Sequence, residues 1–310
     1  MSFFETTPGS REMGDALVNW ALERFSPLSL EPDKLAVTLL AFRQPLKPEN
    51  AMERPAGFAY HGDQPFYPCS VVKVFYLAAV HARLEKDAIT PHKELDRAMR
   101  DMIRWSSNTA TNYIVDLVTG TTGDTLLEEA EMSDWADRRQ WVNRYFRALG
   151  WPESQLINVC QKLMDDDRYG REKIFVRIGG NNHNRLTTDA TARLFHAIFA
   201  GHMISTERSR AMAFLLARPL DDPAFCEHPA AQIRGYFGAG LPSGARLWSK
   251  AGLTGWTGDA DASFRRHDAA YVELPTGRAF ILVVFTQGRS VSQNESVLPA
   301  IAMRAAELVG

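Results

Sequence analysis

The sequence predicts a mixed α/β fold of the α+β kind, in which terminal helices flank an antiparallel sheet and an all-helical part is inserted. Short apolar runs rich in β-formers occur near both chain ends, and helical spacing dominates the middle. The 310 residues are 45% hydrophobic and 23% charged, which suits a globular chain with a sizeable core. We expect a single domain over 1–310, with an α/β part (about 1–66 and 201–310) and a helical part (about 67–200).

The N-terminal elements follow from local patterns. A serine cap and an apolar period of 3.6 residues predict a helix over 10–25. Apolar β-rich runs predict strands over 34–42 and 56–63. The polar, glycine- and asparagine-rich stretch 158–186 has little periodicity, which is typical of a functional or mobile loop. Helical spacing predicts the remaining helices at 70–86, 91–104, 109–118, 134–149, 188–200, near 206–217 and at 296–309.

Strands return toward the C-terminal end, at 245–252, 267–274 and 278–287. The last of them contains seven consecutive apolar residues, as expected of a central strand with both faces covered. These strands and the two near the N-terminus would build one sheet from both ends of the chain.

Composition excludes several classes of partner and cofactor. The net charge of −2 gives no electrostatic argument for nucleic acid or an anionic membrane, and no apolar run reaches the ~18 residues of a membrane span. The first residues lack the basic and apolar regions of a secretory signal, so we expect a cytoplasmic protein, or a periplasmic one if a signal peptide was removed. Three irregularly spaced cysteines and scattered histidines predict neither a disulfide frame nor a metal site, and no cofactor is expected.

Ser70 and Lys73 form the only S-x-x-K pattern in the chain, at the start of an almost wholly apolar helix. A serine hydroxyl becomes a nucleophile when a base takes its proton, and a lysine one helical turn away faces it. Apolar surroundings lower the pKa of such a lysine, so that its neutral amine can act as the base. The alternative is a helix cap followed by a lysine that extends its charge to water.

Two further polar patterns follow. Ser106-Ser107-Asn108 lies just ahead of a helix, where it is also a good N-cap sequence, and a second S-x-N occurs at 292–294. Lys250-Ala251-Gly252 ends a strand and is the only K-x-G in the chain. It is either an edge-strand lysine with a turn glycine or a strand edge that lines a site for an anionic substrate group.

In this order the three patterns resemble the S-x-x-K, S-x-N and K-[TS]-G motifs of serine β-lactamases and penicillin-binding proteins, most closely those of class A β-lactamases. Ser106 follows Ser70 by 36 residues and Lys250 follows Ser106 by 144, which is close to the class A spacing. The stretch "NRLTTDATARLF" at 184–195 resembles the segment that opens the helix after the omega loop of that family. The resemblance covers roughly 10–308 and implies the β-lactamase-like fold.

The resemblance also implies chemistry at the first two motifs. Ser70 would be the nucleophile that forms the acyl-enzyme, and Lys73 would be its proton partner. Ser106 would relay a proton to the leaving group.

Substrate binding is implied for four residues. Asn108 would hydrogen-bond the substrate amide, and Lys250 would hold a substrate carboxylate. The backbone N–H groups of Ser70 and Leu253 would form the oxyanion hole. Gly252 would let the substrate approach the strand backbone.

The chain departs from the family pattern at three places. Ser107 stands where class A enzymes usually have a mainly structural aspartate. Ala251 replaces the Thr or Ser whose hydroxyl helps to bind the substrate carboxylate, which puts affinity for penicillin-like acids in doubt. The omega-loop signature E-x-x-L-N, whose Glu positions the hydrolytic water, is missing. Counting back from the Thr-Thr pair gives Glu172 as the candidate, and Asp165, Asp166 and Asp167 are alternatives.

The sequence therefore predicts a class A β-lactamase-like serine hydrolase that acts through an acyl-enzyme. Its partner would be a small molecule with an amide, lactam or ester bond, and β-lactams are among the candidates. One alternative is an acylatable penicillin-binding-like protein or sensor with little turnover. Another is an amidase of the glutaminase or peptidase type.

Overall fold

Within residues 2–51, 54–163 and 168–310, which the computed structural model describes, six strands form one antiparallel sheet. Their order is β2-β1-β6-β5-β4-β3, so the β1–β6 pair joins the strands from the two ends of the chain. The strands are β1 (Leu35–Phe42), β2 (Ala56–Tyr60), β3 (Ala217–Arg218), β4 (Arg246–Thr254), β5 (Arg265–Glu273) and β6 (Ala279–Gln287).

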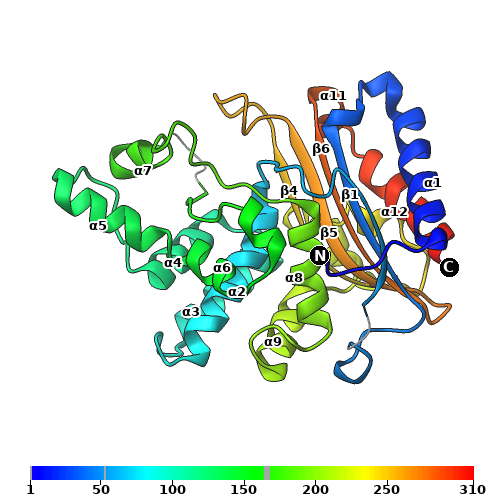
Figure 1. Cartoon of the computed structure of the whole chain (residues 1–310), viewed down its shortest axis with the longest axis horizontal. Helices are drawn as coiled ribbons and strands as arrows, with labels where there is room; N and C mark the ends of the chain where they lie inside the picture. The colour runs from blue at the N-terminus through cyan, green and yellow to red at the C-terminus, as the bar shows by residue number, and fades with distance from the viewer. Residues whose placement is uncertain (1, 52–53, 164–167) are drawn as a thin grey trace.

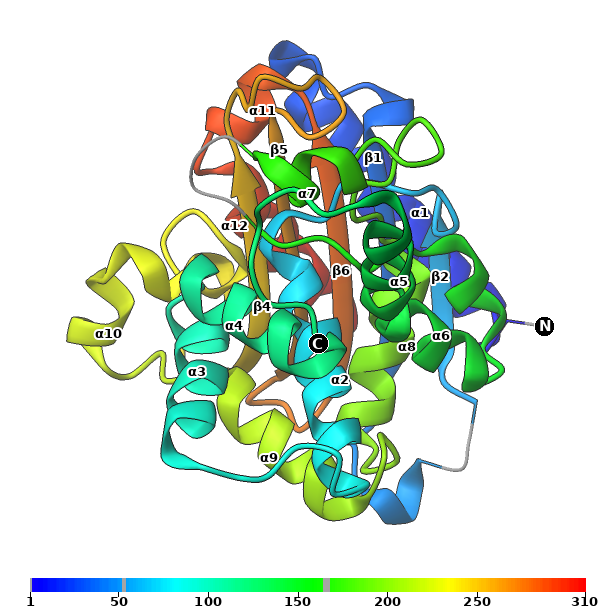
Figure 2. The same ribbon diagram turned by 90° about the vertical axis from the view of Figure 1, so that its left-hand side faces the viewer.

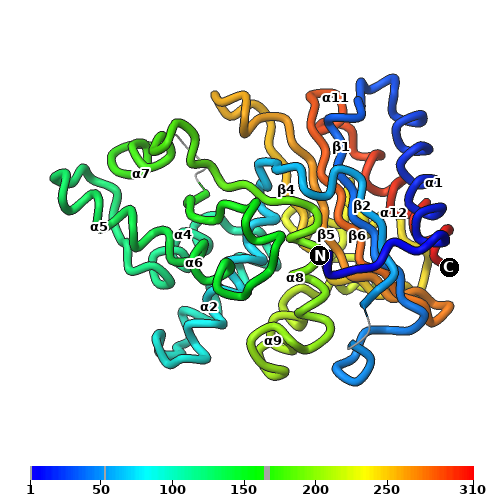
Figure 3. The backbone as a smooth tube through the Cα atoms, viewed as in Figure 1, coloured from blue at the N-terminus to red at the C-terminus, as the bar shows by residue number. Residues whose placement is uncertain are grey.

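Helices cover both faces of the sheet. Figure 1 shows α1 (Pro8–Phe25) and α12 (Val297–Val309) together on one face. Figure 3 traces the backbone and shows the C-terminal end of the chain on this side of the molecule. The opposite face packs against α8 (Thr188–Phe199), and beyond it lies the helical part that contains α2 (Lys73–Glu85).

The remaining helices lie around α2 or in the connections, and Figure 2 looks onto this side of the molecule. The α-helices are α3 (Lys93–Arg104), α4 (Asn108–Thr119), α5 (Glu129–Arg139), α6 (Trp141–Ala148), α7 (Gly170–Phe175), α9 (Thr206–Leu216), α10 (Pro223–Glu227) and α11 (Arg289–Gln293). The short 3-10 helices are η1 (Ser26–Leu28), η2 (Pro32–Lys34), η3 (Pro48–Asn50), η4 (Cys69–Val72), η5 (Pro152–Leu156), η6 (Pro229–Ala231) and η7 (Phe237–Gly240).

The central strand β6 explains why the sheet forms where it does. Its first eight residues are buried, and successive side chains enter different cores because strand side chains alternate between faces. Ile281 and Val283 join the apolar cluster shared with α2 and α8, while Leu282 and Val284 join the cluster under α1 and α12. The continuous apolar run is therefore the signature of a strand with both faces covered.

The predicted mixed α/β architecture is confirmed. The helix expected at 134–149 is instead two helices, α5 and α6, which meet at Gln140. The stretch 158–186, expected to be irregular, contains the short helix α7, and the two-residue strand β3 was not predicted. The division into an α/β part and a helical part stays a prediction, because one apolar cluster runs from the sheet into the helices.

Candidate active site

Ser70 lies on η4, immediately before α2 begins at Lys73. The backbone N–H of Lys73 donates to the carbonyl of Ser70, so the two residues share one tight turn. Cys69, just before the serine, has a φ of 49°, a left-handed conformation that costs a non-glycine residue free energy. Eleven of the thirteen α2 residues are buried, and this packing holds the strained turn in place.

Two fully buried lysines meet at one serine hydroxyl. Lys73 Nζ donates to Ser106 Oγ at 3.1 Å and to Asn108 Oδ1 at 2.8 Å, and it also contacts the Ser106 carbonyl. Lys250 Nζ donates to the same Ser106 Oγ at 3.0 Å. The structure thus brings into contact side chains from each of the three motifs, namely Lys73, Ser106, Asn108 and Lys250. Since Ser106 Oγ accepts from both amines, its own proton is available to another acceptor.

Lys250 also has two acceptors of its own. It donates to the Ala251 carbonyl at 2.7 Å and contacts Gln232 Oε1. Burial, and then the positive charges of Lys73 and Arg218, lower the pKa of Lys250 well below its ordinary value.

Strand β4 passes directly against the serine turn at Gly252. A Cβ at that position would lie 2.7 Å from the backbone nitrogen of Ser70 and 2.7 Å from the Cβ of Cys69. Only glycine permits this approach, which brings the backbone of β4 against the Ser70 N–H. Leu253 follows on the strand and is 45% exposed, so the neighbouring backbone is open to a substrate.

Two of the three departures from the family pattern, Ser107 and Ala251, can be explained by their surroundings. Ser107 Oγ accepts from the backbone N–H of Ala110 at 3.1 Å and so caps α4. The methyl group of Ala251 is fully buried in the cluster under the terminal helices. Because strand side chains alternate, this methyl group lies on the opposite face from the Lys250 side chain.

Sequence reasoning missed Arg218 and Gln232. The fully buried guanidinium of Arg218 donates to the Ser249 carbonyl at 2.9 Å and to the Ile103 carbonyl at 3.0 Å, which ties α3 to β4. An arginine inside the apolar run "LLARPL" was the available signal. Gln232, the Lys250 partner, is in a loop with a φ of 58° and belongs to no motif.

A neutral histidine, His267, anchors the backbone segment just before Ser70. Burial lowers the pKa of His267 to about 3, so the ring carries one proton at neutral pH. Its Nδ1 accepts from the Thr286 backbone at 3.0 Å, so Nε2 donates to the Tyr67 carbonyl at 2.9 Å. Burial also raises the pKa of Cys69 to about 12, which keeps its thiol protonated and unreactive.

The structure places Glu172 in a buried ionic cluster. Its two carboxylate oxygens accept from the guanidinium of Arg139 at 2.7 and 3.2 Å, and both side chains are almost fully buried. Lys162 and Asp116 complete the cluster with a 2.7 Å ion pair. Glu172 thereby anchors α7 to α5, and this geometry does not support its predicted role as the residue that positions the hydrolytic water.

The alternative acids Asp165, Asp166 and Asp167 lie outside the described residues. Leu163 is the last described residue before them, and its backbone is fixed to α4. Its N–H donates to Asn112 Oδ1 at 2.9 Å, and its carbonyl accepts from Asn112 Nδ2 at 2.8 Å. Asn112 is one helical turn beyond Asn108, so Leu163 is held close to the second motif.

Among residues 2–51, 54–163 and 168–310, no three His, Cys, Asp or Glu side chains converge as metal ligands. The helices of this described part include none with the length and apolar character needed to cross a bilayer.

Comparison with known proteins decides the family. Residues 94–309, more than two thirds of the chain, match the family model described as the beta-lactamase enzyme family. The chain belongs to this family. The resemblance found from the three motifs is thus confirmed, although the matched range begins after Ser70 and Lys73. The chain is a β-lactamase-like serine hydrolase.

Solved structures of β-lactamases share the fold of this family member. The β-lactamase of Sphaerobacter thermophilus is 20% identical with a TM-score of 0.64, and the match covers 96% of this chain and 97% of that one. A β-lactamase of Xanthomonas campestris is 16% identical with a TM-score of 0.64, covering 96% and 99%. One of Chitinophaga pinensis is 17% identical with a TM-score of 0.62, covering 94% and 97%. The comparison with curated proteins gave no significant match.

Proposed function

We propose that this chain hydrolyses a small molecule with an amide, lactam or ester bond through an acyl-enzyme on Ser70. The observation that carries the proposal is the contact of two buried lysines with Ser106 Oγ, beside the turn that presents Ser70. A hydroxyl that is hydrogen-bonded to two amines can pass protons between a nucleophile and a leaving group.

Acylation begins with Lys73 in its neutral amine form: Ser70 Oγ attacks the substrate carbonyl, and its proton passes to the lone pair of the Lys73 nitrogen. The tetrahedral oxyanion accepts hydrogen bonds from the backbone N–H groups of Ser70 and Leu253, which the close approach at Gly252 supports. Ser106 then gives a proton to the leaving group and is reprotonated from the lysine side. The C–N or C–O bond breaks, and the acyl group stays on Ser70.

Asn108 and Lys250 orient the substrate in this proposal. Asn108 begins α4, its amide oxygen accepts from Lys73, and in this proposal its side chain hydrogen-bonds the substrate amide. The three N–H groups of Lys250 have three protein oxygens as partners. The positive potential of Lys250 therefore favours binding of a substrate carboxylate. Lys250 contacts the reaction through its hydrogen bond to Ser106.

The assay uses nitrocefin and simple p-nitrophenyl esters, each with the unmodified chain and with Ser70→Ala. The proposal expects turnover of at least one substrate and its loss in Ser70→Ala. Equal turnover of every accepted substrate by both proteins would overturn the mechanism.

Hydrolysis of the acyl-enzyme needs a general base that takes a proton from the attacking water, and four carboxylates are candidates. The test is the lifetime of the acyl-enzyme in four variants: Glu172→Gln, Asp165→Asn, Asp166→Asn and Asp167→Asn. The Arg139 ion pair of Glu172 leads us to expect the long-lived adduct in one of the aspartate variants. A long-lived adduct in Glu172→Gln alone, in a fully folded protein, would contradict that assignment.

A second candidate function is an acylatable protein with little turnover. The engagement of Glu172 by Arg139 favours it, because the carboxylate predicted to drive deacylation is bound elsewhere. Mass spectrometry of the intact chain after mixing with penicillin separates the two. A lasting adduct without product indicates the trapped protein, whereas product release with a transient adduct indicates the hydrolase.

A further inference from the structure

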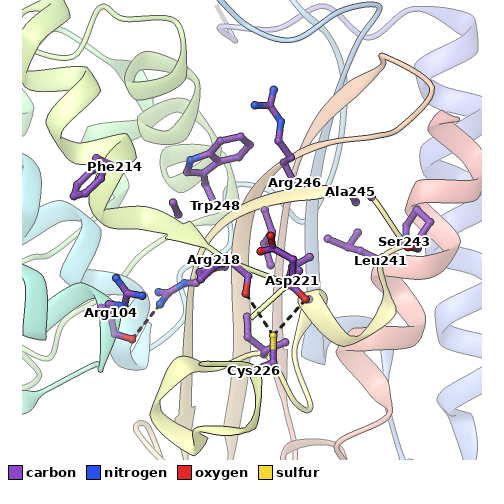
Figure 4. Close-up of a pocket in the computed structure, with 18 residues that line it drawn as sticks. Arg104, Phe214, Arg218, Asp221, Cys226, Leu241, Ser243, Ala245, Arg246 and Trp248 are labelled. Carbon is purple, nitrogen blue, oxygen red and sulfur yellow. Dashed lines mark hydrogen bonds between the residues drawn. The ribbon is translucent and has the colours of Figure 1, made fainter. Parts of the chain in front are cut away.

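A cavity of about 720 Å³ opens at the β3 edge of the sheet. Its walls come from the end of α9, from β3 and the loop after it, and from the first residues of β4, as Figure 4 shows. Neither Ser70 nor Lys73 lines it, so it is distinct from the candidate active site. Its volume is in the range of small-molecule sites in proteins.

Arg104 gives the cavity an uncommitted positive charge. Its Nε is buried and has no hydrogen-bond partner within the described part of the chain. The guanidinium carbon lies 4.9 Å from the ring centre of Phe225 and 5.5 Å from that of Trp105. This stacking holds the guanidinium plane and leaves its edge for an acceptor. Figure 4 shows the Arg104 side chain below Phe214 and beside the end of the Arg218 side chain.

The other charged groups of the lining have partners or face water. Arg218 donates to backbone carbonyls, including that of Arg104 at 3.1 Å. Arg246 is paired with Glu273. Asp221 is exposed and is the one acid among the lining residues that the structure describes. Arg104 is therefore the group best placed to bind an anion in the cavity.

Apolar surface adjoins this charge. Phe214 is 80% exposed, which is unusual for a phenylalanine on a well-packed helix. Leu241 and Trp248 continue the apolar lining, and buried Leu247 and Ile233 add to it. A ligand that fits this wall needs an apolar body as well as an anionic head.

We propose that this cavity binds a small amphipathic carboxylate, with its head on Arg104 and its apolar chain along Phe214 and Trp248. A guanidinium edge donates to both carboxylate oxygens, and the exposed rings lose contact with water when the apolar chain of the ligand covers them. The binding is non-covalent and lies beyond the reaction proposed at Ser70.

The test is calorimetric titration of the full chain with sodium octanoate. We expect saturable binding of one octanoate per chain and no saturable binding of octylammonium, which has the same tail and the opposite charge. Arg104→Gln should weaken octanoate binding about tenfold or more, because it removes a charge-assisted pair. Arg104→Lys keeps the charge and should retain part of the affinity.

Two comparison variants separate the cavity from other causes. Arg11→Gln removes an exposed arginine from α1, away from the cavity lining, and should leave octanoate binding unchanged. Phe214→Ser removes apolar wall at a highly exposed position and should weaken binding while leaving the fold intact. If Arg104→Gln unfolds, Phe214→Ser and Arg104→Lys decide the matter.

Three results would overturn the proposal. The first is no saturable binding of octanoate up to about 10 mM, well above the Kd range of small-ligand sites. The second is equal octanoate affinity in the unmodified chain, Arg104→Gln and Phe214→Ser. The third is loss of octanoate binding in Ser70→Ala, which would place the ligand in the candidate active site.

Discussion

Replacing Glu172 by Gln tests whether this residue holds α7 to α5 or positions the hydrolytic water. Its carboxylate makes two hydrogen bonds to Arg139, and the two side chains are 1% and 0% exposed. The change leaves the Arg139 charge buried, with Asp116 the nearest remaining carboxylate at 3.8 Å. Breaking a buried pair by removing one partner costs about 3–5 kcal/mol.

The expected shift in thermal stability follows from chain length. An unfolding entropy of about 2.1 cal/mol/K per residue over 310 residues gives roughly 0.65 kcal/mol per degree. A loss of about 3–5 kcal/mol in the free energy of unfolding therefore lowers Tm by about 5–8 °C. Calorimetry measures it directly, and the rate of Ser70 acylation below the transition should stay within a few-fold.

Matched variants check this interpretation of Glu172. Glu94→Gln breaks an exposed pair with Arg97 and should lower Tm by less than about 1 °C. Combining Glu172→Leu with Arg139→Met removes both charges and should recover much of the loss, because no buried charge is then unpaired. A Glu172→Gln protein with unchanged Tm and a persistent acyl-enzyme would refute the reasoning.

Three further predictions concern the site and its supports. Gly252→Ala should slow Ser70 acylation by about 10²-fold, because its Cβ would displace the Ser70 backbone, whereas Gly255→Ala has open space and should react normally in the same stopped-flow assay. Ser107→Ala should lose about 1 kcal/mol of unfolding free energy in urea through the lost α4 cap, and Ser107→Asp should not; equal losses would exclude the cap explanation. Burial lowers the pKa of His81 to about 4. The contribution of neutral His81 to the free energy of unfolding is therefore complete above its unfolded pKa of about 6.5, and it falls by about 2 kcal/mol as the pH is lowered to 5. His81→Leu should flatten that part of the stability–pH curve, since neither ring nitrogen has a hydrogen-bond partner in the described chain, and an unchanged slope would assign the acid sensitivity elsewhere.

Much of the fold could be predicted because buried positions recur at regular intervals in the sequence of a helix or strand. Strand β6 is a continuous apolar run, and α2 is an apolar helix that begins at a polar turn. Strand β3 has two residues, too few to show a period, and the break at Gln140 lies inside one continuous helical pattern. These two elements are determined by tertiary contacts and not by local propensity.

The candidate site divides in the same way. Lys73, Ser106, Asn108 and Lys250 were found because each belongs to a short motif, and the structure brings them into contact while their roles stay predictions. Gln232 lies in a loop without a motif, so its bond to Lys250 could not be predicted.

Glu172 shows where counting along the chain fails. Its offset from the Thr-Thr pair suggested a catalytic acid, but offset alone does not say which side chain a carboxylate will meet. The partner, Arg139, lies 33 residues earlier on another helix, and only the packing of α7 against α5 brings them together.

The central claim is that Ser70 forms an ester with the substrate acyl group. Intact-mass spectrometry, followed by peptide mapping, tests it within seconds of mixing the chain with penicillin or a p-nitrophenyl ester. Our account predicts one added acyl mass per chain, located on the peptide that contains Ser70 and absent from Ser70→Ala. An adduct on any other residue, or substrate turnover by Ser70→Ala at the unmodified rate, would contradict it.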